Sequence, residues 1–213
     1  SQSVSLTEKT IAKLVDRHTG IGFDQLLTVS PPRSPEMDFR YRIFNADGTE
    51  AEQCGNGARC FLRFVRDRGL TTKNSIKVET NKGSIECKLH KDGNISVDMG
   101  SPVLQPDKIP FITDTCAVTY TLELASCLST HSETISVAAV NMGNPHAVTI
   151  VDNIDRAPVN QVGALVESHP QFPEKVNVGF MQIVSRDRIN LRVYERVVGE
   201  TNACGSGACA AVV

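Results

Sequence analysis

The stretch RIFNADGTEAEQCGNGARC, residues 42–60, returns later in the chain as RVYERVVGETNACGSGAC, residues 192–209. Arg42 corresponds to Arg192 and Cys54 to Cys204, and both pairs lie 150 positions apart (192 − 42 and 204 − 54). The glycines behind each cysteine repeat as well. Because self-similarity of this kind indicates a duplicated fold, we expect two related halves, residues 1–100 and 101–213.

Both copies have the same order of predicted elements: helix, strand, turn, strand, glycine-rich turn, helix. Apolar and polar residues alternate before each glycine-rich turn, which predicts a strand. After Cys54 the spacing of Ala58, Phe61, Leu62 and Val65 predicts a helix. We therefore expect an α+β fold of two pseudo-symmetric domains, each an antiparallel-rich sheet wrapped around a central helix.

The repeat extends upstream of these strands. Gly-Phe-Asp-Gln at residues 22–25 matches Gly-Phe-Met-Gln at residues 179–182, an offset of 157 (179 − 22) that predicts a loop seven residues longer in the first copy. A helix is expected before each motif, and its predicted apolar face is Ile11, Leu14 and Val15 in the first copy and Val162, Leu165 and Val166 in the second. Prolines at 102, 106 and 110 indicate a linker over residues 100–110.

Composition limits the class of protein. The chain has 213 residues, 40% of them hydrophobic and 22% charged, as in a globular protein. A net charge of −2 does not indicate the basic surface that binds nucleic acid. The sequence contains no apolar run long enough to cross a membrane. The odd number of cysteines, seven, favours thiols in a reducing compartment over a disulfide framework. We expect a cytoplasmic protein without nucleic-acid or membrane partners.

The paired cysteine turns suggest a reaction. A cysteine at the start of a helix experiences the helix dipole and free N–H groups, so the pKa of its thiol is expected to fall. Glycines at 55, 57, 205 and 207 allow the backbone to approach a ligand closely. Two such turns facing each other could hold one amino acid between Cys54 and Cys204, one removing the Cα proton and the other returning a proton on the opposite face. That chemistry is racemisation or epimerisation, and it needs no metal or other cofactor.

Three other functions fit parts of the pattern. Gly55-Asn56-Gly57 alone could indicate nucleotide binding, but it leaves the duplicated cysteines unexplained. A metal-binding protein could use Cys54, Cys60, Cys204 and Cys209, although these lack the spacing of a zinc knuckle. A redox dithiol is the third alternative, and the chain has no Cys-x-x-Cys. The remaining cysteines, Cys87, Cys116 and Cys127, are expected to be small buried residues.

Four stretches resemble the diaminopimelate epimerase family: residues 45–60, Met-Gly-Asn-Pro-His at 142–146, Val-Asn-Val-Gly-Phe at 176–180, and residues 194–209. The resemblance implies conversion of LL- to meso-diaminopimelate, with Cys54 and Cys204 as the catalytic thiols and His146 and Glu195 as residues that tune them. It also implies a substrate-binding set, which consists of Gln25, Asn45, Gly55, Asn56, Asn144, Asn177, Glu195, Arg196, Gly205 and Ser206. Arg196 suits the distal carboxylate because a guanidinium pairs with a carboxylate in a bidentate way.

The proline and hydroxyproline racemases are the alternative family, because they share the two-cysteine plan but have different residues around the cysteines. A homodimer is expected only from the resemblance. The family's opening strand and glycine-asparagine-aspartate-phenylalanine motif have no counterpart here, and residues 208–213 are a helix-like run without a termination signal. From the sequence we therefore expect a chain truncated at both ends.

Overall fold

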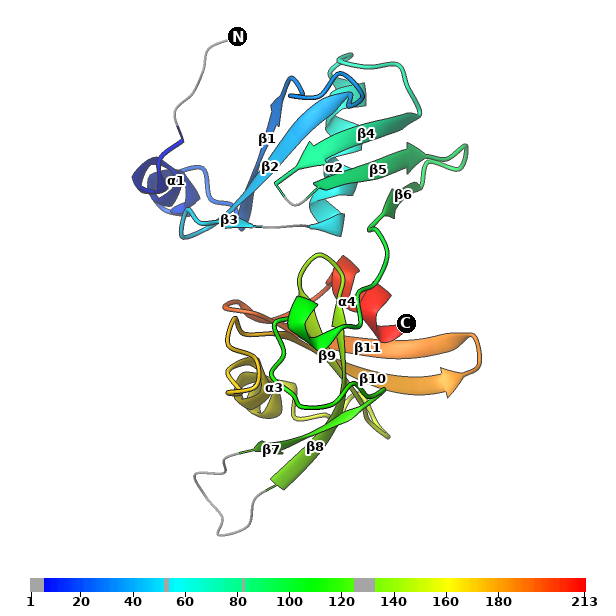
Figure 1. The fold of residues 1–213 in the computed structure, drawn as a ribbon. Helices are drawn as coiled ribbons and strands as arrows, with labels where there is room; N and C mark the ends of the chain where they lie inside the picture. The colour runs from blue at the N-terminus through cyan, green and yellow to red at the C-terminus, as the bar shows by residue number, and fades with distance from the viewer. Residues whose placement is uncertain (1–5, 52–53, 82, 125–132) are drawn as a thin grey trace. The chain divides into compact units, whose positions relative to one another are not determined.

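A computed structural model describes residues 6–51, 54–81, 83–124 and 133–213. The chain forms two compact units, unit 1 (Ser1–Asp98) and unit 2 (Met99–Val213). Each unit contains a six-stranded sheet and two α-helices (Figure 1). The predicted α+β class is confirmed, and Cys127 lies outside the described residues.

Unit 1 has its strands in the order β1-β2-β4-β5-β6, and β3 pairs with β2. Only β2 and β4 run parallel; the other pairs are antiparallel. The elements are α1 (Glu8–Val15), β1 (Gln25–Ser30), β2 (Phe39–Asn45), β3 (Glu50–Ala51), α2 (Gly55–Asp67), β4 (Ser75–Thr80), β5 (Gly83–Leu89) and β6 (Ile95–Asp98).

The core of unit 1 forms between α2 and its sheet. The predicted stripe on this helix is buried at all four positions, Ala58, Phe61, Leu62 and Val65. Phe61 packs edge-on against Tyr41 of β2, with 5.1 Å between the ring centroids. Burying side chains of this size contributes about 1.5–3 kcal/mol each, so this packing fixes the helix on the sheet and with it the turn at its start.

Unit 2 has the strand order β12-β11-β10-β9-β8-β7, in which only β9 and β10 are parallel. Its elements are the short 3-10 helix η1 (Pro106–Lys108), β7 (Tyr120–Leu124), β8 (Glu133–Asn141), β9 (Pro145–Ile150), α3 (Val159–Glu167), β10 (Asn177–Ser185), β11 (Arg188–Glu195), β12 (Gly199–Thr201) and α4 (Gly205–Ala211).

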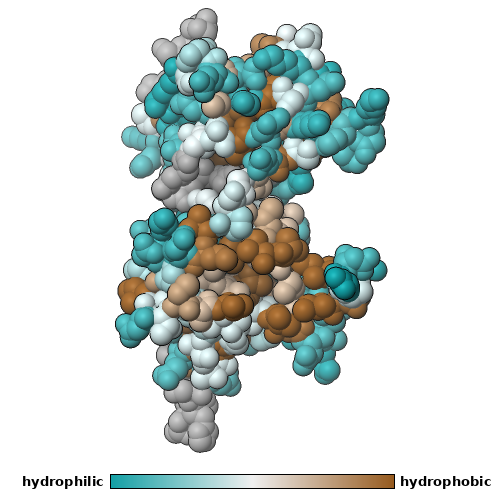
Figure 2. Space-filling model, turned by 45° about the vertical axis from the view of Figure 1, so that its right-hand side comes forward, coloured by the Kyte–Doolittle hydropathy of each residue, from teal (hydrophilic) through white to brown (hydrophobic). Residues whose placement is uncertain are grey.

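The two helices of unit 2 lie on opposite faces of its sheet. On β9 the neighbours Ala147 and Val148 point to different faces, as successive strand residues must; Ala147 joins the cluster that includes α3, and Val148 joins the cluster that includes α4. The α4 face is covered less well, because Met181 and Leu191 are only partly buried there. Apolar side chains gather on a broad face of this unit (Figure 2).

The predicted repeat is present as α1-β1-β2-β3-α2 and α3-β10-β11-β12-α4. The upstream match, however, was wrong in register. Gln25 pairs with Asn45, and in unit 2 Val178 pairs with Tyr194, so that one residue further Asn177 lies opposite Glu195. Gln25 therefore corresponds to Asn177, an offset of 152 (177 − 25), and not to Gln182.

The first copy is thus longer by two residues (45 − 25 against 195 − 177), not by seven. Residues 31–38 join β1 to β2, whereas only residues 186–187 join β10 to β11. The longer strands β10 and β11 offset four residues of that six-residue difference in loop length. Strand pairing decides the register, and a shared Gly-Phe dipeptide does not.

Two further expectations need correction. On α3 the predicted apolar face is confirmed at Val166, which is buried, and at Val162, which packs against the same core, but it was wrong at Leu165, which is exposed. Residues 100–110 are not a free linker either. Val103 forms a β-bridge with Asn141, and Ile109 is fully buried in unit 2. The apolar residues between the prolines bind this segment to the domain.

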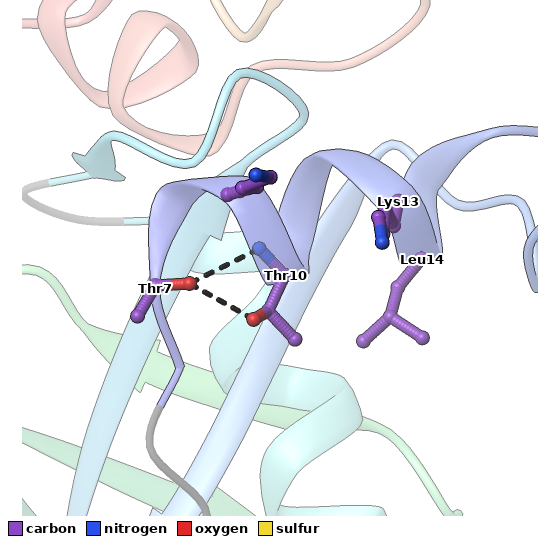
Figure 3. A pocket seen from close by; sticks show the side chains of 5 residues that line it. Thr7, Thr10, Lys13 and Leu14 are labelled. Carbon is purple, nitrogen blue, oxygen red and sulfur yellow. Dashed lines mark hydrogen bonds between the residues drawn. The ribbon is translucent and has the colours of Figure 1, made fainter.

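Helix α1 shows how a local signal sets an element boundary. Thr7 is its N-cap, and the Thr7 hydroxyl accepts a hydrogen bond from the main-chain N–H of Thr10 at 3.2 Å. The two hydroxyl groups also lie 2.9 Å apart (Figure 3). The shallow pocket shown there is lined only by residues 7–14 and contains none of the predicted site residues.

Candidate active site

Cys54 is the N-cap residue of α2, which places its side chain beside the free N–H groups of the first helical turn. Its Sγ accepts a hydrogen bond from the main-chain N–H of Gly57 at 3.3 Å. A hydrogen bond donated to sulfur favours the thiolate over the thiol. The turn therefore assists deprotonation at Cys54.

Gly57 is required at this turn for steric reasons. A Cβ added there would lie 2.4 Å from the Oη of Tyr41 and 2.9 Å from Cδ2 of Leu27. The Tyr41 hydroxyl donates to the carbonyl oxygen of Cys54 at 3.3 Å. Burial raises the pKa of Tyr41 well above its ordinary value, so the hydroxyl remains a donor. Tyr41 and Gly57 together fix the backbone at the cysteine.

The strand before each cysteine is held by an arginine–glutamate pair that is repeated at the 150-residue offset. In unit 1, Arg42 Nε and Nη2 donate to Glu50 at 2.9 and 2.8 Å. In unit 2, Arg192 Nε and Nη2 donate to Glu200 at 2.6 and 2.9 Å. Because each glutamate lies four residues before the cysteine, these bidentate pairs support both cysteine turns in the same way.

Cys204 occupies the equivalent N-cap position of α4. Its Sγ lies 3.6 Å from the hydroxyl of Ser206, which in turn lies 3.0 Å from Nε2 of His146. The same Nε2 is 3.0 Å from Oδ1 of Asn144. These contacts connect four predicted site residues in one hydrogen-bond network.

His146 is neutral in this network. It is fully buried, and burial, with a smaller effect of the Arg196 charge, lowers its pKa from 6.5 to about 4. Oδ1 of Asn144 can only accept, so the single ring proton resides on Nε2 and points to Asn144 and Ser206. Nδ1 has no hydrogen-bond partner among the described residues. The Ser206 hydroxyl can then donate its own proton to the sulfur of Cys204.

This buried imidazole predicts acid sensitivity of unit 2. Its pKa is lowered in the folded state, so below pH 6.5 the unfolded chain gains a proton that the folded chain does not accept until about pH 4. As the pH falls from 6.5 to about 4, this residue therefore lowers the free energy of unfolding by about 3 kcal/mol. Urea unfolding between pH 7 and pH 4 should show a steeper loss for the wild type than for His146→Gln. Equal pH slopes would show that the imidazole does not contribute.

A second set of contacts in unit 2 positions Arg196. The side chain of Asn177 donates from Nδ2 to the carbonyl oxygen of Pro145 at 3.0 Å and accepts at Oδ1 from the main-chain N–H of Arg196 at 2.9 Å. Arg196 Nη1 donates to the carbonyl oxygen of Glu174 at 3.0 Å. Asn177 thus joins the strand that starts at Pro145 to the turn that carries Arg196. These two bonds fix the main chain at Arg196.

The other predicted residues are placed as follows. Gln25 Nε2 donates to Oδ1 of Asn45 at 3.3 Å across β1 and β2. The carboxylate of Glu195 accepts from the hydroxyl of Thr201 at 2.5 Å. Gly55 and Asn56 begin α2, and Gly205 and Ser206 begin α4. The predicted residues therefore form two groups, one in each unit, and Asn144 and His146 of the second group lie before the repeat, at the start of β9.

Sequence reasoning missed some of the supporting residues. Tyr41 lies in the strand expected before the first glycine-rich turn, and alternation gave no sign that its buried hydroxyl would bond to Cys54. Cys87 agrees with the expectation of a buried thiol, and burial raises its pKa to about 11. The same expectation was wrong for Cys116, which is exposed. As for the metal-binding alternative, within the described residues no group of three His, Cys, Asp or Glu side chains could hold one ion.

Comparison with known proteins identifies the family. The sequence pattern of the diaminopimelate epimerase family matches residues 1–105 and 138–213. The diaminopimelate epimerase of Nitrosomonas europaea is 60% identical over 213 residues, which is all of this chain and 75% of that protein. Those of Azoarcus sp. and Aromatoleum aromaticum are 57% and 56% identical, over 99% and 100% of this chain and 74% of each relative.

Solved structures show a shared fold at low sequence identity. A probable proline racemase from Agrobacterium radiobacter has a TM-score of 0.64 at 16% identity, covering 94% of this chain and 62% of that chain. A phenazine biosynthesis protein of the PhzF family from Bacillus anthracis has a TM-score of 0.58 at 18% identity, covering 95% and 68%. The sequence identity to named relatives is decisive: this chain belongs to the diaminopimelate epimerase family.

Proposed function

We propose that this chain interconverts LL- and meso-diaminopimelate by proton transfer at one Cα, using the thiols of Cys54 and Cys204. The observation that carries the proposal is the duplicated N-cap cysteine in a member of this family, at equivalent points of two related units. In this account residues 1–100 and 101–213 are the two epimerase halves. Each supplies one cysteine.

The proposed reaction needs only proton transfer. The thiolate of one cysteine takes the Cα proton and becomes a thiol, leaving an electron pair delocalised into the α-carboxylate. The other cysteine donates its proton to the opposite face of the carbon and becomes the thiolate. The N–H groups of Gly55, Asn56, Gly205 and Ser206 stabilise the charge that develops on the carboxylate. No cofactor takes part in these steps.

The two thiols are supported differently. The bond from the Gly57 N–H to Cys54 is a fixed backbone contact. Cys204 depends on a chain of side chains, from His146 through Ser206, in which every member is neutral. We infer that His146 acts by holding the Ser206 hydroxyl toward Cys204. It does not carry a charge in the resting state.

The remaining residues bind the far end of the substrate. Arg196 pairs with the distal carboxylate in a bidentate way, and Gln25, Asn45, Asn144, Asn177 and Glu195 hold the rest of the substrate. A cytoplasmic location is supported by the free thiols at Cys60, Cys87, Cys116 and Cys209. In the described residues no helix is long and apolar enough to cross a membrane. The assembly proposed for the active enzyme is a homodimer.

Substrate choice tests the proposal. The full chain should convert LL-diaminopimelate to the meso form and leave L-proline unchanged, because proline has no second charged end for Arg196. Chiral chromatography of both reactions measures this. The Cys54→Ala/Cys204→Ala double variant, prepared in parallel, detects any contaminating epimerase. If the chain racemised proline as fast as it epimerises diaminopimelate, it would be a proline racemase and the proposal would be wrong.

A further inference from the structure

Glu167 is a buried acidic residue for which the proposed reaction has no role. It ends α3, is 8% exposed, and its side chain points to the turn between β11 and β12. Its Oε1 accepts the main-chain N–H of Val197 at 2.7 Å and lies 3.5 Å from the ammonium of Lys175. Carboxylates are buried only when paired in this way.

The turn that Glu167 contacts is strained. Val197 has φ of +69°, in the left-handed region. A β-branched residue in this region is a true outlier, because its side chain is crowded against the backbone. Such strain persists only where surrounding contacts hold it. The bond to Glu167 is such a contact, and it acts directly on the amide of the strained residue.

The same turn carries two of the predicted substrate residues. Glu195 and Arg196 precede Val197, and the Val198 N–H donates back to the carbonyl oxygen of Glu195 at 3.1 Å. Lys175, the ion-pair partner of Glu167, is itself left-handed with φ of +61° and follows Glu174, whose carbonyl oxygen holds the Arg196 guanidinium. Glu167 therefore contacts both segments that define the position of Arg196.

The corresponding turn in the first copy of the repeat is held by different contacts. The equivalent turn spans Asn45 to Thr49. Its left-handed residue is Gly48, one position later than Val197 at the 150-residue offset, and the Asp47 side chain accepts the Thr49 N–H at 2.9 Å. Helix α1 ends at Val15, as α3 ends at Glu167, and the carboxylate of the following residue, Asp16, accepts the main-chain N–H groups of His18 and Thr19. Within the described residues, no side chain of α1 forms such a bond to the turn of the first copy.

From these contacts we propose that Glu167 is a positioning residue. It holds Val197 in the left-handed conformation and thereby fixes Glu195 and Arg196 for the substrate. The inference rests on the proposed function, because it assigns Arg196 to substrate binding. Loss of Glu167 should let the turn relax to an unstrained conformation and displace Arg196, without altering either cysteine.

A rescue experiment tests this. Glu167→Ala should raise KM for LL-diaminopimelate by about ten- to hundredfold while kcat falls much less. Glu167→Gln, which keeps an oxygen acceptor, should remain within about threefold of the wild type. Val197→Gly makes the left-handed conformation intrinsically accessible. The double variant Glu167→Ala/Val197→Gly should therefore regain most of the lost affinity.

The matched control is Val198→Gly, at the adjacent exposed position of the same turn, where no left-handed conformation is needed. It should not rescue Glu167→Ala. If Glu167→Ala does not fold, Glu167→Asp replaces it, because it keeps the charge beside Lys175 and withdraws the carboxylate by one methylene. An unchanged KM, or equal rescue by both glycines, overturns the inference. A wild-type chain inactive on diaminopimelate overturns the proposed function instead.

Discussion

Replacement of either Cys54 or Cys204 by alanine is expected to reduce epimerisation by at least about 10²–10⁴-fold, the range that one general acid or base contributes. Each thiol serves one face of the Cα, so the loss of either stops the reaction in both directions. Steady-state rates with LL- and with meso-diaminopimelate measure this. The two single variants should be similarly impaired.

Matched controls exist in the same helices. Cys60 in α2 and Cys209 in α4 lie five or six residues beyond the proposed catalytic positions and are not N-caps. Cys60→Ala and Cys209→Ala should retain nearly full turnover. Substantial activity of Cys54→Ala or Cys204→Ala in the absence of added thiol would contradict the two-base account.

Gly57→Ala is the second substitution with a large expected effect. In an exposed helix this change adds about 1 kcal/mol of stability, but here the new Cβ would collide with the Tyr41 hydroxyl at 2.4 Å. The turn must move, and a displacement of about 1 Å at a reacting group costs about 10²-fold in rate. We expect kcat to fall by that factor. The equivalent Gly207→Ala should cost less than tenfold, because its nearest neighbour is 3.2 Å away.

Removing the Tyr41 hydroxyl tests whether its clash with the new Cβ causes the loss of activity in Gly57→Ala. Tyr41→Phe deletes the oxygen that the new methyl group meets, so Gly57→Ala/Tyr41→Phe should recover part of the activity that Gly57→Ala loses. Tyr41→Phe alone should be mildly impaired, since it gives up the bond to the Cys54 carbonyl. If the double variant is no better than Gly57→Ala, contact with Tyr41 is not the reason for the glycine.

Local patterns predicted much of this fold. Period-3.6 spacing marked the buried face of α2, and the 150-residue repeat placed both cysteines at equivalent helix starts. The helix before the second copy was less well predicted, since Leu165 is exposed while Gly163 is buried against Tyr194. A small residue in a packing contact carries no hydropathy signal, so periodicity alone does not assign it to the buried face.

Long-range contacts account for what the sequence did not reveal. The correspondence of Gln25 with Asn177 depends on strand pairing, which a shared Gly-Phe dipeptide does not determine. Glu167 lies at the end of an ordinary helix, and nothing near it in the sequence indicates a bond to Val197, thirty residues away. The neutral state of His146 follows from its burial, which becomes visible only when β9 lies inside the sheet.

Turnover of LL-diaminopimelate in deuterium oxide tests the central claim most directly, because it identifies the source of the proton that reaches the product. If Cys54 and Cys204 act on opposite faces, the returning thiol has already exchanged with solvent. The first meso product should then carry deuterium at the inverted Cα, while the remaining LL substrate keeps its proton; proton NMR and mass spectrometry distinguish the two. Meso product that retains the original proton, or label entering LL substrate as fast as product, would contradict a reaction with two bases.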